Sequence, residues 1–179
     1  MNIGSARLIH AGINFVLGGG QSLNPAHYAR RFQDALRDAG LDYHTVDIPN
    51  DLVLVVIRKH PSPLEFRIAS AGPNIGQLMV IAENPLTTFE LFEQEAEATV
   101  EAFKSVWSSQ NRVLLQVDAT IRELYETTSE HAFQELWEER LGQPGNALAA
   151  FGRPIRGGGL RFVLDPRPPE EPAAVEVKI

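Results

Sequence analysis

The chain has 179 residues, 44% of them hydrophobic and 22% charged, which is typical of a folded protein of about one domain and disfavours disorder. It contains no cysteine, so disulfides, thiolate metal sites and a cysteine nucleophile are excluded. The formal net charge is −7, and residues 83–140 alone carry −9. Because proteins that bind nucleic acid usually present a dense basic surface, this charge disfavours a nucleic-acid partner.

Neither a secretory leader nor a membrane helix is predicted. Met1–His10 lacks a basic segment followed by a long apolar stretch. The longest uninterrupted apolar run, Leu52–Ile57, is far shorter than the roughly 20 residues that a membrane helix requires. We therefore expect a soluble, cytoplasmic protein without a membrane partner.

The first half of the sequence predicts a strand, a helix and four more strands. The extended stretch Ala6–Leu17 ends at three consecutive glycines, Gly18–Gly20. Asn24 is suited to cap a helix that has Pro25 at its first position, and Gly40 is suited to end it. Four strand candidates follow with short links, which favour an antiparallel meander: Leu41–Ile48, Leu52–Ile57, Leu64–Ala69 and Gln77–Ala82.

The second half predicts the longest helix, a strand, further helices and two final strands. Thr87-Thr88-Phe89-Glu90 matches a capping box and predicts the start of a helix of about 20 residues. Ser129 is suited to cap a later helix that ends at Gly142. The other predicted elements are a strand over Arg112–Ile121, a short helix over Asn146–Phe151, and strands over Leu160–Leu164 and Ala174–Ile179.

The resulting order, β-α-β-β-β-β-α-β-α-(α)-β-β, predicts an α+β fold with a mostly antiparallel sheet. We expect one domain over residues 1–165, a proline-rich linker over 166–173 and a terminal strand over 174–179. That last strand needs a pairing neighbour, from a second chain or from sequence beyond Ile179. Apolar periodicity predicts these buried residues: Phe32, Leu36, Val53, Val55, Phe66, Phe92, Phe103, Phe133 and Trp137.

Two glycine-rich segments are candidates for binding an anion. Backbone N–H groups after Gly18–Gly20 could hold phosphate, but Leu23 stands where a dinucleotide motif has its third glycine, and no P-loop lysine follows. A simple strand-to-helix turn is the better interpretation of this segment. In the second segment, Arg153, Arg156 and Arg161 surround three glycines, and guanidinium groups bind anions in bidentate fashion.

The arginine segment has an ordinary alternative, a surface loop whose arginines are solvated or paired within the chain. Glu93, Glu97 and Glu101 repeat every four residues along the long helix. Like charges at this spacing repel, and a basic partner would relieve the repulsion. We expect this acidic stripe to be either a solvated face or an interaction surface. We also expect one of the three arginines to pair with a glutamate from residues 83–139.

The sequence predicts no catalytic residues, metal or cofactor. Its five histidines are scattered, and H-E-x-x-H is absent. His131 and Glu135 could share a metal on one helix, but zinc needs three or four ligands. The leading hypothesis is a non-catalytic protein–protein interaction or structural module that acts as a homo-oligomer, such as a homodimer. The alternative is an enzyme or sensor that binds a small anionic ligand through Gly18–Gly20 or through Arg153–Arg161.

Overall fold

The structure is a computed structural model that describes residues 6–20, 22–107, 112–127, 132–144, 146, 152, 161–169 and 172–178. The chain divides into two compact units, Arg7–Leu124, and Met1–Ala6 together with Tyr125–Ile179. Beyond Leu124, the two strands that the structure describes pair with each other.

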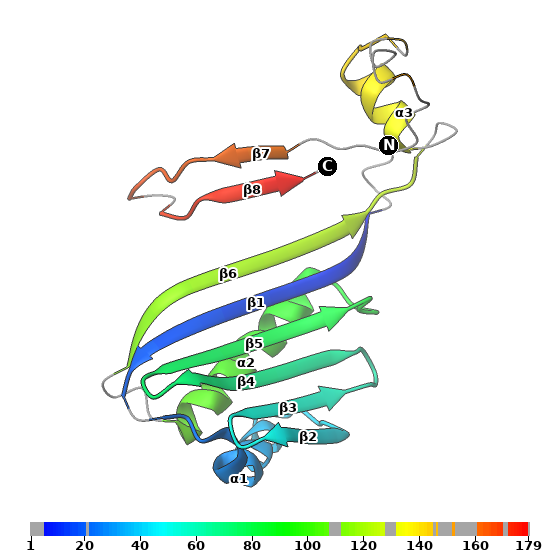
Figure 1. Ribbon diagram of the computed structural model, residues 1–179. Coiled ribbons are helices and arrows are strands. Elements are labelled where there is room, and N and C mark those ends of the chain that lie inside the picture. The colour runs from blue at the N-terminus through cyan, green and yellow to red at the C-terminus, as the bar shows by residue number, and fades with distance from the viewer. Residues whose placement is uncertain are drawn as a thin grey trace. The chain divides into compact units, whose positions relative to one another are not determined.

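The first unit contains one six-stranded sheet of order β2-β3-β4-β5-β1-β6, in which every pair of neighbours is antiparallel (Figure 1). The four strands of the predicted meander are adjacent, and β1 lies between β5 and β6. The elements are β1 (Arg7–Gly19), α1 (Pro25–Asp38), β2 (Thr45–Asn50), β3 (Val53–Arg58), β4 (Leu64–Gly72), β5 (Ile75–Glu83), α2 (Phe89–Val106) and β6 (Arg112–Leu124).

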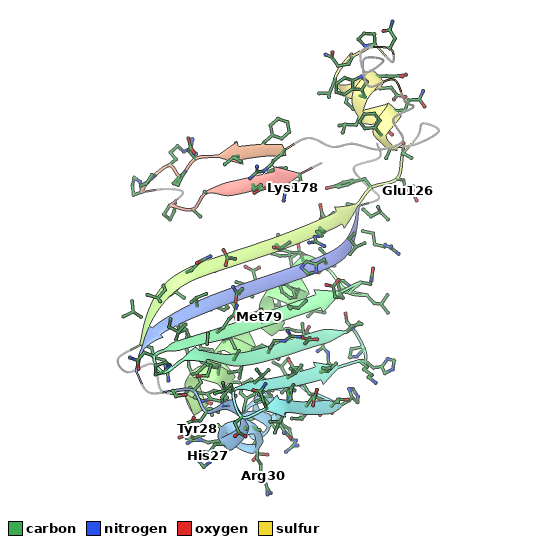
Figure 2. All side chains as sticks on the ribbon, viewed as in Figure 1. His27, Tyr28, Arg30, Met79, Glu126 and Lys178 are labelled. Carbon is green, nitrogen blue, oxygen red and sulfur yellow. The ribbon has the colours of Figure 1, made fainter. Side chains whose placement is uncertain are left out.

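Both helices cover the same face of this sheet, the far face in Figure 1. Cross-strand partners point to the same face, and Leu54, Ile68 and Leu78 are partners in turn across β3, β4 and β5, all of them buried. We call this the helix face. The opposite face, on which neither α1 nor α2 lies, is called the open face, and Met79 marks it in Figure 2.

The predicted helix signals are present, with two corrections. Asn24 precedes α1 with left-handed backbone (φ 43) and makes no side-chain cap, and Gly40 after the helix has φ 76. The cap of α2 is Thr88 and not Thr87, since Thr88 Oγ1 accepts a hydrogen bond from the Leu91 N–H at 3.4 Å. Hydrogen bonds from the backbone N–H of Glu90 and from Thr88 lower the pKa of the Glu90 carboxyl.

The core lies between the helix face and the two helices, around an aromatic cluster. The ring centroids of Phe32 lie 5.4 Å from those of both Phe66 and Trp107, and Phe103 stacks on Trp107 at 5.0 Å. The indole N–H of Trp107 donates to the carbonyl oxygen of Leu23. Six of the predicted core residues are buried: Phe32, Leu36, Val55, Phe66, Phe92 and Phe103.

Three predicted core residues are half-buried instead. Val53 lies on the open face, because its partner across β4 is Ala69 and not one of the buried residues of the helix face. Phe133 and Trp137 belong to the second unit, where their rings stack on each other at 6.0 Å. The periodicity identified apolar sides, but it did not determine how completely each side is covered, since Val55 on the same open face is buried.

The second unit contains a short helical segment, α3 (Ala132–Gln134) followed by η2 (Glu135–Arg140), and a hairpin of β7 (Arg161–Leu164) and β8 (Val175–Lys178). β8 therefore has its antiparallel partner within its own chain. The element order agrees with the predicted α+β order. Ser129 and most of the predicted short helix at 146–151 lie outside the described residues. Among the helices described, none is long and apolar enough to cross a membrane.

Candidate functional site

β6 forms one edge of the six-stranded sheet and is the most exposed strand of the first unit. It pairs with β1 along its whole length, from Arg112 opposite Gly19 to Leu124 opposite Arg7. Within the described residues of this sheet, its other side has no strand partner. A strand in this position presents a row of backbone N–H and C=O groups that can pair with another chain. We call this side of β6 the outer edge.

The side chains of β6 are unusually apolar for an exposed strand. Six large apolar residues are each between 46% and 62% exposed: Val113, Leu114, Leu115, Val117, Ile121 and Leu124. Val117 and Ile121 point to the helix face, since they are opposite Phe15 and Ala11 of β1. Because α1 and α2 pack over the other strands, the helix face is left uncovered at β6.

The opposite edge of the sheet, β2, differs from β6 in length and composition. β2 has six residues, includes Pro49, and its pairing with β3 is irregular between Asp47 and Asn50. Proline, irregular pairing and short length all protect edge strands from pairing with another chain. β6 has 13 residues with neither proline nor glycine, and its pairing with β1 is regular from Gln116 to Arg122.

Three polar side chains of β6, those of Gln116, Asp118 and Arg122, lie on the open face. The Asp118 carboxylate accepts a hydrogen bond from the Asn14 amide at 3.2 Å and from the Gln116 amide at 2.9 Å. Arg122 lies further along the same face, opposite His10, whose Nδ1 is 2.8 Å from the Glu83 carboxylate. Within the described residues, the Arg122 guanidinium forms no ion pair. The strand at the outer edge thus carries an acid, Asp118, and a base, Arg122, four residues apart on the same face.

The predicted anion-binding arginines are only partly described. Arg161 lies on β7, and its guanidinium forms a bidentate pair with the Glu176 carboxylate of β8, at 2.8 and 3.1 Å. Hydrogen bonds from Arg161 and Lys178 lower the pKa of Glu176 to about 2. The observed partner of Arg161 is therefore Glu176 and not a glutamate from residues 83–139. Arg153 and Arg156 lie outside the described residues, so the anion-binding hypothesis for the three together stays a prediction.

The two other predicted sites have ordinary surroundings. Gly18 and Gly19 belong to β1, where Gly18 pairs with both neighbouring strands, and the Gly19 N–H donates to the Asn74 carbonyl at 2.9 Å. The acidic stripe, which consists of Glu93, Glu97 and Glu101, is exposed along α2. Glu101 forms a 2.6 Å pair with Lys104 on the same helix. Its use as an interaction surface stays a prediction.

A buried ion pair that the sequence reasoning missed joins the sheet to α2. The guanidinium of Arg58 at the end of β3 donates to both carboxylate oxygens of Glu95, at 2.6 and 2.7 Å, and its Nε donates to the Ser62 carbonyl at 2.9 Å. The Arg58 side chain is 6% exposed and that of Glu95 is 15%. Both residues lie on the buried sides of their elements, and this pattern could have predicted the pair.

The Tyr43 hydroxyl is buried near this pair and the Thr99 side chain. Burial raises the pKa of Tyr43 to about 12. Tyr43 also lines a surface hollow of about 30 Å³, which holds no more than one or two water molecules. The described part of the chain contains no group of three or more histidine, aspartate or glutamate side chains arranged to hold a metal ion.

Comparison with known proteins adds no functional assignment. The sequence matches no protein-family model, and no relative among curated proteins was found by sequence similarity.

Proposed function

We propose that the protein is a non-catalytic protein–protein interaction module that self-associates through the outer edge of β6. The observation that carries this proposal is the contrast between the two edges of one sheet. β2 is short and contains proline, whereas β6 is long, apolar and regularly paired with β1 from Gln116 to Arg122. Addition of a strand to an exposed edge is a common mode of protein recognition, in which main-chain hydrogen bonds provide affinity.

The exposed apolar side chains support the same proposal. Val117 and Ile121 are each about half exposed on the helix face, beside half-buried Phe15 of β1. A partner strand next to β6 would remove part of this apolar surface from water, which favours association. The proposal places the module in the cytoplasm, as the sequence predicts, and assigns it no cofactor.

The test compares matched glutamate substitutions on the two edge strands. Val117 on β6 and Ile48 on β2 are 46% and 44% exposed, so neither replacement buries a charge in the folded monomer. Val117→Glu should convert an oligomer of wild-type protein to a monomer of 19.8 kDa, as measured by light scattering after gel filtration. Ile48→Glu should keep the wild-type mass. A wild-type protein that is monomeric at every concentration would refute self-association.

A further inference from the structure

We infer that the partner on β6 is a second copy of this chain, paired antiparallel about a two-fold axis at Thr120. This inference rests on the proposed function and specifies its partner and its register. The symmetry of a two-fold dimer restricts the pairing, because whenever a residue of one copy lies opposite a second residue of the other copy, the reverse pair must form as well. Side chains alternate between the two faces along a strand. If the helices of both copies are to lie on the same side of the joined sheet, residues that are opposite each other must share a face. This condition is met only when one residue of β6 lies opposite its own copy.

The charges of β6 distinguish the remaining registers. If the axis passed through Val117, Arg112 would lie opposite Arg122 of the partner subunit. If it passed through Asp118, that residue would lie opposite its own copy. Like charges directly opposite each other destabilise a strand pair, so both registers are disfavoured. An axis at Ala119 places Arg122 opposite the partner subunit's Gln116, which is neutral.

The register centred on Thr120 brings opposite charges together. It places Asp118 opposite the partner subunit's Arg122, and symmetry repeats this pair on the other side of the axis. Among axes from Gln116 to Arg122, Thr120 alone produces this match. On the helix face, the same register places Ala119 opposite the partner subunit's Ile121. The Arg122 guanidinium, which has no ion-pair partner in the described residues of one chain, would obtain one from the second.

The experiment is disulfide crosslinking, for which the natural chain is well suited because it has no cysteine. Directly opposite residues of an antiparallel pair have Cα atoms about 4.5–5.5 Å apart, within the limit of roughly 7 Å for a disulfide. We expect Thr120→Cys to form a covalent dimer under mild oxidation. Ala119→Cys is the matched control, because in this register the two copies of residue 119 are diagonal neighbours on the other face, about 8 Å apart.

The outcomes separate this inference from the proposed function. The register is supported if Thr120→Cys forms the covalent dimer at a rate at least about tenfold higher than Ala119→Cys does. The reverse preference, or equal rates, in a protein that light scattering shows to be dimeric would overturn the register and leave self-association through β6 intact. A monomeric wild-type protein in which neither variant crosslinks would overturn both. Circular dichroism of the reduced variants checks that each is folded.

Discussion

Removal of the Glu95 carboxylate is expected to be the most destabilising loss of a single charge on α2. Glu95 accepts two of the three hydrogen bonds that the Arg58 guanidinium makes in the structure. A hydrogen bond to a charged group contributes about 1.5–3 kcal/mol, and breaking a buried ion pair by removal of one partner costs about 3–5 kcal/mol. Because Arg58 is 6% exposed, we expect Glu95→Ala to lower the free energy of unfolding by about 3–5 kcal/mol.

The assay is urea unfolding followed by the fluorescence of Trp107, in a Trp137→Phe background so that one tryptophan reports on the first unit. Glu101→Ala is the control. Its 2.6 Å pair with Lys104 is as short as the buried pair, but the Glu101 side chain is 70% exposed and that of Lys104 is 52% exposed. Glu101→Ala should therefore lower the free energy of unfolding by less than about 1 kcal/mol.

A second variant tests the physical reason for the loss. Arg58→Met combined with Glu95→Leu removes both charges together, and buried pairs replaced by apolar residues often lose little or no stability. The double variant should therefore recover most of what Glu95→Ala loses. The reasoning is refuted if Glu95→Ala costs no more than Glu101→Ala, or if the double variant is less stable than Glu95→Ala alone.

Two other predictions concern packing and titration. A Cβ at Gly76 would lie 2.5 Å from Leu23 Cδ1, and Leu23 is 1% exposed, so Gly76→Ala should cost about 1–3 kcal/mol in urea unfolding. Gly72→Ala, with no atom within 4 Å, is the control and should stay within about 0.5 kcal/mol of wild type; an equal loss would contradict the packing argument. Burial raises the pKa of Tyr43 to about 12, whereas an unfolded tyrosine titrates near 10. The folded state therefore holds this proton longer, and stability should fall as pH rises from about 10 to 12. Tyr43→Phe should weaken that dependence and remove the latest step in tyrosinate absorbance; a titration that keeps the step would assign it to another tyrosine.

Local signals in the sequence were sufficient to predict the order of the elements. Pro25 and Gly40 bound α1, and short links between the next four strands require them to be neighbours. These features act over a few residues, so no knowledge of distant contacts is needed. The one-residue error at the start of α2 arose because Thr87 and Thr88 can both cap a helix, and it is Thr88 that makes the cap hydrogen bond.

The edge position of β6 could not be predicted from such local signals. β1 inserts between β5 and β6, which brings together segments about a hundred residues apart in the sequence, such as Asn14 and Asp118. Arg112–Ile121 was predicted to be a strand, but its neighbour and its uncovered helix face depend on that long-range pairing. The end of the first unit depends on the same long-range pairing, since it falls where β6 completes the sheet.

The most direct test of the account mixes two variants of β6 with opposite charge changes. Asp118→Arg places two arginines on the outer edge, and Arg122→Asp places two aspartates there, so each variant alone should repel its own copy in the register centred on Thr120. Sedimentation velocity should find each variant at the monomer mass of 19.8 kDa and an equimolar mixture at twice that mass. The account is contradicted if the mixture sediments as monomer under conditions where the wild-type protein is a dimer, or if each variant alone dimerises as well as the wild type.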